Sequence, residues 1–201
     1  MQKQNPLNII LLGDPAAGKA THGKFLAKKY KLYDLDMGRE LRGLEHNKVL
    51  RKKYRLGKTL DSGKLTPTEL VRNLLRDKIR ATPKTRGILF NGTPKMLGEA
   101  KLVAKWLKQE HRNSVLFIYL SIPLRETISR MTARKTYFRG KFSKRPDDNK
   151  KALQNRVSYY KKNISQVVKY FKTLYPFINV STLGTIQEAE KRLMGKLEKF
   201  E

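Results

Sequence analysis

The sequence predicts an α/β fold built on a doubly wound parallel sheet of five strands. Short apolar runs, typical of parallel strands buried on both faces, alternate along the chain with longer stretches of helical character. This alternation is the pattern from which parallel sheets are built. The candidate strands are Ile9–Leu12, Ile88–Phe90, Val115–Leu120 and Phe177–Val180, with a less apolar candidate at Leu32–Leu35.

The predicted helices separate these strands. Capping boxes at Thr66–Glu69 and Thr185–Glu188 mark two of the helix starts. Residues 136–146 show no period, and we predict a mobile loop there. The apolar face of the last helix consists of Ile186, Ala189, Leu193 and Leu197. The helices are expected at about 18–30, 67–80, 97–109, 123–135, 149–172 and 185–199.

A glycine-bounded loop with a lysine follows the first candidate strand. Residues 13–18 read Gly-Asp-Pro-Ala-Ala-Gly, and Lys19, Ala20 and Thr21 come next. The two glycines let the backbone curl so that successive N–H groups point at phosphate oxygens, and the lysine adds a positive charge. The following helix presents its positive N-terminal end. A phosphate-binding P-loop is therefore predicted, although the strict pattern has Ser or Thr where Ala20 stands; a plain strand–turn–helix is the alternative.

Composition limits the class of protein. A chain of 201 residues suits a single domain with a full core. There is no cysteine, which excludes disulfides and thiolate zinc sites. The apolar run before Gly13 is too short for a signal peptide, and no segment approaches the roughly 20 apolar residues of a membrane span. We therefore expect a cytoplasmic protein without membrane contact, and nothing in the sequence demands more than a monomer.

The net charge of +28 needs an explanation of its own. Such a charge attracts polyanions, so nonspecific contact with nucleic acid is one expectation. A lineage-wide preference for lysine on solvated surfaces explains the charge equally well. Composition does not decide between them.

Arginines suggest what a phosphate loop would be used for. Phosphoryl transfer spreads negative charge over the moving group, so catalysis consists mainly of positioning and cationic clamping. Arg130 and Arg134 are four residues apart and share a helix face. Arg145 precedes a pair of aspartates, and Arg156 follows in the next predicted helix. Each arginine alone is typical of a solvated surface, but two pairs that bracket one aperiodic segment indicate a clamp.

With these motifs, essentially the whole chain resembles the adenylate kinase family of nucleoside monophosphate kinases. That family's phosphate loop, Gly-x-Pro-Gly-x-Gly-Lys-Gly-Thr, is matched by residues 13–21 with alanines at 16 and 20. Its acceptor turn, Ser-Thr-Gly-Asp-x-x-Arg, corresponds to residues 36–42, and its Gly-Lys-Leu-Val to residues 63–66. Its Asp-Gly-Phe-Pro-Arg becomes Asn-Gly-Thr-Pro-Lys at 91–95. The lid motifs match Arg130, Arg134, Arg145, Asp147, Asp148 and Arg156.

The resemblance implies a P-loop fold and a reaction. One kinase domain would span residues 1–201, with a core of 1–37, 81–130 and 149–201. A helical acceptor-binding subdomain at 38–80 and a short lid at 131–148 would be inserted in it. The implied reaction is reversible transfer of the γ-phosphoryl group of ATP to a nucleoside monophosphate, above all AMP, which yields two ADP. No structural zinc is expected, because the lid is short and lacks cysteines.

The resemblance also implies residue roles. ATP would contact Gly13, Asp14, Pro15, Ala16, Ala17, Gly18, Lys19, Ala20, Thr21, Arg130 and Arg134. The monophosphate would contact Met37, Gly38, Arg42, Leu65, Gly92, Lys95, Glu99, Arg145 and Arg156. The catalytic cations would be Lys19, Arg134, Arg145 and Arg156, and the lid would close through Asp147 and Asp148. Mg²⁺ would accompany ATP and meet Thr21 and Asn91 mostly through water.

Three departures from the family pattern affect the metal and the acceptor. Asn91 replaces an aspartate and lacks the charge that holds Mg²⁺ near the phosphates. Lys95 replaces an arginine and loses the bidentate fork for phosphate. Glu99 replaces a glutamine, and a carboxylate only accepts hydrogen bonds, which suits guanine better than adenine. Alternatively, Glu99 is a solvated helix residue, and backbone carbonyls near Leu65 read the base.

Three functional hypotheses follow. The first is an active kinase of AMP or, failing that, of GMP and then UMP or CMP. The second is a nucleotide-binding protein of this fold that turns over slowly and associates with RNA. The third is an enzyme that acts on another small phosphorylated acceptor. The complete set of lid arginines favours the first, because a pure binding module needs charge but not this spacing.

Overall fold

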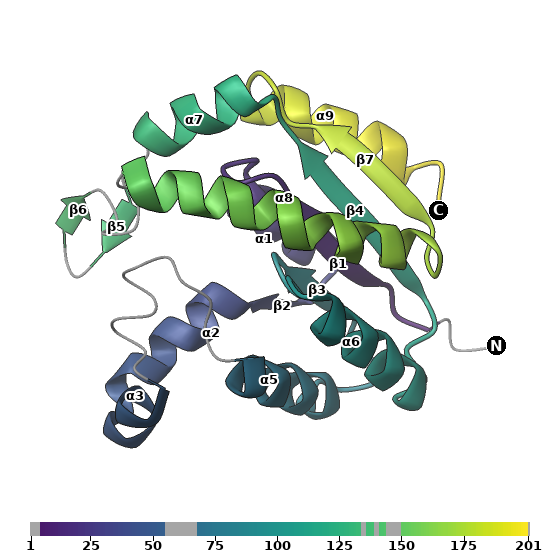
Figure 1. Ribbon diagram of the computed structural model, residues 1–201. Helices are drawn as coiled ribbons and strands as arrows, with labels where there is room; N and C mark the ends of the chain where they lie inside the picture. The colour runs from purple at the N-terminus through teal and green to yellow at the C-terminus, as the bar shows by residue number, and fades with distance from the viewer. Residues whose placement is uncertain (1–4, 55–67, 134–135, 139–140, 144–149, 201) are drawn as a thin grey trace.

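A five-stranded parallel sheet occupies the centre of the molecule (Figure 1). The computed structural model describes residues 5–54, 68–133, 136–138, 141–143 and 150–200. The sheet order is β2-β3-β1-β4-β7, which confirms the predicted doubly wound fold. The strands are β1 (Asn8–Gly13), β2 (Tyr33–Asp36), β3 (Ile88–Asn91), β4 (Val115–Ser121) and β7 (Phe177–Ser181).

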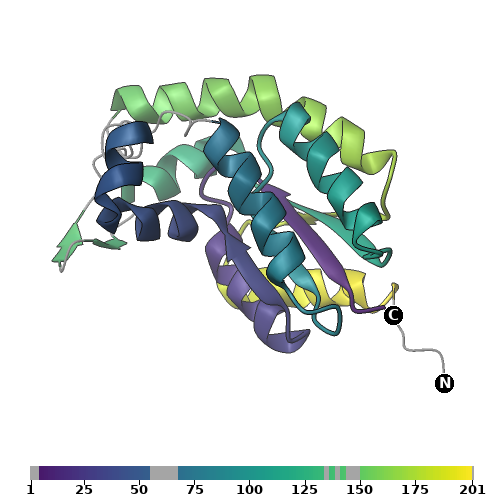
Figure 2. The same ribbon diagram turned by 90° about the horizontal axis from the view of Figure 1, so that it is seen from below.

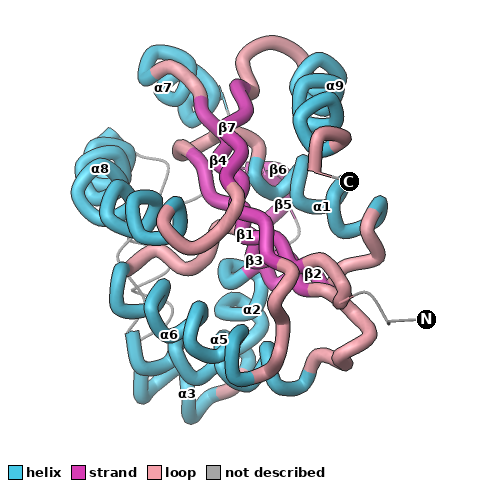
Figure 3. Tube along the Cα trace, turned by 90° about the vertical axis from the view of Figure 1, so that its right-hand side faces the viewer, coloured by secondary structure: helices cyan, strands magenta, loops and turns pink. Residues whose placement is uncertain are grey.

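Helices cover both faces of this sheet, as the edge-on view in Figure 3 shows. Successive side chains of β1 point to opposite faces. Ile10 and Leu12 therefore join one buried cluster, whereas Ile9 and Leu11 join the other. The first cluster is completed by α5 (Thr68–Ala81), α6 (Leu97–Gln109) and α8 (Lys150–Lys172). The second is completed by α1 (Lys19–Lys29) and α9 (Ile186–Leu197).

The chain between β2 and α5 is helical where it is described. It forms α2 (Met37–Gly43), a 3₁₀ turn η1 (Leu44–His46) and α3 (Lys48–Tyr54), which extend beyond the sheet edge (Figures 1 and 2). The Asp36 carboxylate begins α2 by accepting a 3.1 Å hydrogen bond from the Arg39 backbone N–H. The capping box predicted at Thr66 lies outside the described residues. The proposed division into core, acceptor subdomain and lid stays a prediction.

A short antiparallel hairpin follows α7 (Leu124–Ala133). It consists of β5 (Thr136–Phe138) and β6 (Lys141–Ser143), with Tyr137 opposite Phe142. The prediction of an aperiodic loop is therefore wrong for these six positions. Strands of three residues are too short to show a period in the sequence.

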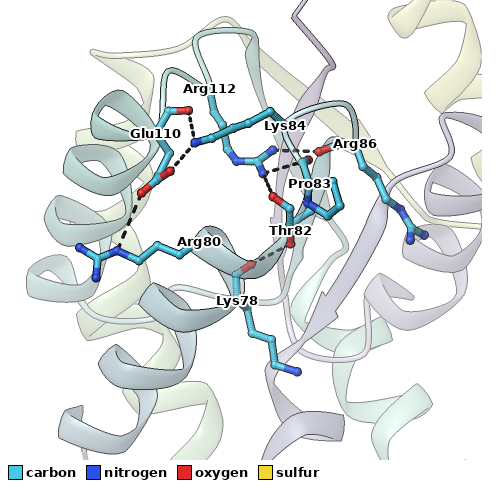
Figure 4. A network of polar contacts seen from close by, with 8 residues as sticks. All are labelled: Lys78, Arg80, Thr82, Pro83, Lys84, Arg86, Glu110 and Arg112. Atoms are coloured by element: carbon cyan, nitrogen blue, oxygen red, sulfur yellow. Dashed lines mark hydrogen bonds and ion pairs between the residues drawn. The ribbon is translucent and has the colours of Figure 1, made fainter.

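A buried arginine ties the loop between α5 and β3 to the chain that follows α6 (Figure 4). The Arg112 guanidinium donates to the backbone carbonyls of Arg86 at 2.8 Å and Pro83 at 3.2 Å, and also to that of Thr82. Arg112 is 3% exposed, and burial lowers its pKa. Three carbonyls of the loop between α5 and β3 thus share one cation.

The helices differ in how they meet solvent. Among the described helices the longest is α8, with 23 residues, which packs Ile164, Val167 and Phe171 into the core while Lys162, Lys169 and Lys172 are exposed. In the described part of the chain, no helix combines the length and the apolar character that crossing a membrane requires.

Candidate functional site

The phosphate loop leads from β1 directly into α1. Gly13 is required at the strand end, because a Cβ there would lie 2.4 Å from the Leu120 carbonyl oxygen. Gly18 caps α1 in the left-handed region, with φ of 78°. Ala16 also has a positive φ of 60°, a conformation that costs about 1 kcal/mol for a residue with a Cβ. The loop thus keeps the shape expected of glycine at position 16 although an alanine stands there.

Lys19 lies at the centre of this loop. Its ammonium Nζ donates to the carbonyl oxygens of Gly13 and Asp14, both at 2.7 Å. The same ammonium stands 5.9 Å from the ring centre of Tyr160. The first backbone N–H groups of a helix have no intrahelical acceptors, so α1 adds donors and a positive helix end beside the lysine. These are the components of an anion-binding site.

Two tyrosines from other elements anchor the phosphate loop, one through the Asp14 carboxylate and one through the Gly13 backbone. Asp14 accepts hydrogen bonds from the Tyr119 hydroxyl at 2.8 Å and from the Ile122 backbone N–H at 2.9 Å. The Tyr160 hydroxyl accepts from the Gly13 backbone N–H at 3.1 Å and donates to the Gly13 carbonyl. Burial raises the pKa of both tyrosines, so both hydroxyls keep their protons. The loop is anchored to the end of β4 and to α8.

The end of β3 brings the predicted acceptor side next to the lysine. Gly92 has φ of 70°, and its backbone N–H donates to the Leu11 carbonyl at 2.8 Å. A Cβ at Gly92 would lie 3.7 Å from Lys19 Cε, so the turn at Gly92 lies beside the lysine side chain. Lys95, three residues later, is exposed.

The acceptor turn folds an arginine over a glycine. A Cβ at Gly38 would lie 3.1 Å from Arg42 Nη1 and 3.2 Å from Asp36 Oδ1. The guanidinium therefore lies back over the first turn of α2, where a larger side chain at position 38 would displace it. Met37 is buried and belongs to the core cluster, which gives this apolar residue a packing role.

Asn91 is buried at the end of β3, 6% exposed. Its amide Nδ2 donates to Asp34 Oδ1 at 3.1 Å, and the Asp34 carboxylate also pairs with Arg39 at 3.2 Å. A Cβ at Gly23 would lie 2.4 Å from Asn91 Nδ2, so this glycine makes room for the amide. Because the nitrogen is committed to Asp34, the amide oxygen is the atom that remains to accept from a water.

Glu99 caps the helix in which it lies. Its Oε2 accepts from the backbone N–H groups of Lys95 at 3.2 Å and Met96 at 3.3 Å, at the start of α6. The residue is 4% exposed, and burial raises its pKa despite these hydrogen bonds. The expectation of a solvated helix residue is therefore wrong. The predicted contact of Glu99 with the acceptor base stays a prediction.

A cavity of about 400 Å³ opens beside the loop, between α1, α7 and the start of α9. Its lining includes Gly18, Thr21, His22, Arg130, Gly184 and Ile186. Arg130 is held there by Glu126 at 2.6 Å and by the Thr182 carbonyl at 2.8 Å. Thr21 is exposed at this end of α1. A fixed guanidinium plane next to a phosphate loop is suited to contact with a nucleotide base.

For several of the predicted site residues, the structure does not describe the side chain. Arg156 falls within α8, and its side chain is not described. Leu65, Arg134, Arg145, Asp147 and Asp148 lie outside the described residues.

Four residues at this site were given no functional role from the sequence alone. These are His22, Asp34, Tyr119 and Tyr160. Tyr160 had a readable signal, since it follows Arg156 by one helical turn. The other three depend on contacts between elements distant in the chain, which no local pattern reveals.

Comparison with known proteins gives one consistent family. A family model described as adenylate kinase matches residues 11–175. An adenylate kinase of Flavobacterium johnsoniae is 30% identical over 194 residues, covering 96% of this chain and 98% of the relative. One from Flavobacterium psychrophilum is 32% identical, covering 93% and 96%. One from Azobacteroides pseudotrichonymphae is 27% identical, covering 96% and 97%.

Proposed function

This chain belongs to the adenylate kinase family, and we propose that it transfers the γ-phosphoryl group of ATP reversibly to AMP, giving two ADP. The relatives are named for that activity, and they match this chain over nearly its full length. The chain is accordingly a phosphotransferase, as its sequence predicts. The hypothesis of an RNA-associated protein with weak turnover is not favoured.

The observation that carries the proposal is the position of Lys19 beside the segment that follows β3. The ammonium is held by two loop carbonyls at 2.7 Å, while Gly92 of the acceptor side borders its side chain. A donor phosphate on the loop and an acceptor phosphate near Lys95 would therefore approach each other across the lysine. Such positioning supplies most of the catalysis in phosphoryl transfer.

The acceptor phosphate would be held by two cations of different kinds. Arg42, which lies over Gly38, presents a planar fork suited to two phosphate oxygens. Lys95 is exposed and contributes a point charge. The lid arginines Arg134, Arg145 and Arg156 would complete the clamp around the moving group.

The residues near the loop fit Mg²⁺ that arrives with the nucleotide. The described residues contain no group of three acidic, histidine or cysteine side chains that would bind the ion alone. They offer the Thr21 hydroxyl and the Asn91 amide oxygen, hard oxygen donors of the kind that Mg²⁺ accepts beside its waters and phosphates. When bound, the ion would neutralise charge on the transferred group. Asp34, 3.1 Å from the Asn91 amide, keeps a negative charge close to the neutral side chain.

A panel of acceptors tests the proposal. ATP and Mg²⁺ are offered with AMP, GMP, CMP, UMP or dTMP, and kcat/KM is measured for each acceptor. We expect AMP to be preferred by about tenfold or more, and Lys19→Ala to lower the rate by about a hundredfold. A preference for another monophosphate would overturn the choice of AMP. A Lys19→Ala variant as fast as the wild type would overturn the role of the loop.

A further inference from the structure

His22 forms part of the wall of the cavity next to the phosphate loop. It is 3% exposed and follows Thr21 in the first turns of α1. Its ring packs against the loop, because a Cβ on Gly18 would lie 3.0 Å from His22 Cδ2 and 3.1 Å from Nε2. Gly18 and His22 both line the cavity. The ring therefore turns its Cδ2–Nε2 edge toward the loop side of the cavity.

The other ring nitrogen faces a carboxylate. His22 Nδ1 is sealed from solvent and has no hydrogen-bond partner among the described residues. Glu190 Oε1, on α9, stands 3.9 Å from it. At this distance the negative charge of the carboxylate acts on the ring electrostatically, and it favours the tautomer that carries its proton on Nδ1. In that tautomer Nε2 bears a lone pair and is an acceptor.

We propose that His22 is a specificity-determining residue of the donor site, where Nε2 accepts a hydrogen bond from the exocyclic amino group of the donor's adenine ring. This inference rests on the proposed function only in taking the cavity as the place of the donor base. Adenine presents an amino donor where guanine presents a carbonyl acceptor. An acceptor at Nε2 attracts the first and repels the second. The site thus discriminates ATP from GTP.

The fixed position of Arg130 supports this proposal. Arg130 is tied to Glu126 and to the Thr182 carbonyl, so its guanidinium plane holds one side of the cavity. Arg130 and His22 line the same cavity, so a base stacked on the guanidinium would lie in the cavity that His22 also borders. The amino group lies on the edge of the adenine ring, and it is the group that would donate a hydrogen bond to His22.

Kinetic discrimination between donors tests the proposal. With AMP saturating at pH 8, kcat/KM is measured for ATP and for GTP. His22→Leu removes the acceptor, and we expect the ATP to GTP ratio to fall about tenfold. His22→Gln keeps an acceptor oxygen and should retain part of the ratio. The matched control is His46→Leu, at an exposed histidine of η1 remote from the cavity, which should leave the ratio unchanged. An unchanged ratio in a folded His22→Leu protein overturns the proposal.

A spectroscopic measurement on the wild type does not depend on turnover or on folding of a variant. The ¹⁵N shifts of His22 at pH 8 should show Nδ1 protonated and Nε2 unprotonated. A non-hydrolysable ATP analogue should shift Nε2, and the matching GTP analogue should not. Protonation at Nε2, or equal shifts with both analogues, would contradict the proposal. These readouts stay decisive even if AMP is not phosphorylated, so failure of the proposed function is recognised separately.

Discussion

Asp14 stands within the phosphate loop, where a carboxylate aimed at bound phosphates would repel them. Both of its oxygens are instead engaged outside the loop, by Tyr119 at 2.8 Å and by the Ile122 N–H at 2.9 Å. Only its backbone carbonyl faces Lys19. The side chain thus fixes the loop to β4 while its charge points away from the nucleotide.

The raised pKa of Glu99 predicts how the stability of the protein changes with pH. Its folded-state pKa is raised by burial, so the native protein binds the proton more tightly than the unfolded chain does. The protonated Glu99 side chain therefore adds stability at a pH below its ordinary pKa, and this stability is lost as the pH rises through the raised pKa. Glu99→Gln removes this dependence and leaves an amide oxygen for the Lys95 and Met96 N–H groups. We expect the melting temperature of Glu99→Gln, relative to wild type, to increase from pH 4 to pH 7.

The control is Glu99→Ala, which removes the cap. It should have a free energy of unfolding about 1 kcal/mol lower than that of Glu99→Gln at both pH values, because neither variant carries the titrating carboxyl. A difference in melting temperature between Glu99→Gln and wild type that stays constant with pH would contradict a raised pKa of Glu99 in the folded protein.

Among the contacts between elements, Arg112 ties the loop between α5 and β3 to the chain that follows α6. It donates to the carbonyls of Thr82, Pro83 and Arg86 while it is almost fully buried (Figure 4). Arg112→Met leaves these carbonyls without their cation, and we expect the free energy of unfolding to fall by about 3 kcal/mol. Urea unfolding measures it.

Lys84 in the same network offers the matched control for that substitution. It pairs with Glu110 at the surface, and exposed pairs contribute less than about 1 kcal/mol. Lys84→Met should therefore be nearly neutral. If Arg112→Met were no more destabilising than Lys84→Met, the buried hydrogen bonds of Arg112 would not contribute to stability.

The five strands were predictable because parallel strands buried on both faces read as continuous apolar runs. Even Tyr33–Asp36, whose residues alternate in polarity, was found within one position. The capping box at Thr185 is confirmed, with the Glu188 N–H 3.2 Å from Thr185 Oγ1 and the Thr185 N–H 2.8 Å from Glu188 Oε2. The hairpin of β5 and β6 was missed because three-residue strands carry no period.

The candidate site was predictable where it depends on local motifs and not where it depends on packing. The phosphate loop follows from its glycine and lysine spacing, and the acceptor turn was identified through the family resemblance of residues 36–42. The capping role of Glu99 was missed because burial, not spacing, distinguishes it from a solvated residue. Ile186 was expected on the buried face of α9, but it is 53% exposed and lines the cavity next to Arg130.

At the scale of the molecule, the sheet sets the distance between the two halves of the site. β1 and β3 are paired in register from Ile9 with Leu89 to Leu11 with Asn91. Their carboxyl ends therefore deliver the phosphate loop and the Gly92 turn to the same edge, where ligands bind in open α/β sheets. The net charge of +28 is not needed for this arrangement, and its predicted attraction for nucleic acid stays a prediction.

The proposed reaction requires that two nucleotides are bound side by side and exchange a phosphoryl group. The most direct measurement supplies ADP and Mg²⁺ alone and follows the products by ³¹P NMR. ADP must then occupy both halves of the site, and we expect equal amounts of ATP and AMP with no inorganic phosphate. ADP that stays unchanged, or that yields AMP and inorganic phosphate without ATP, would contradict the account.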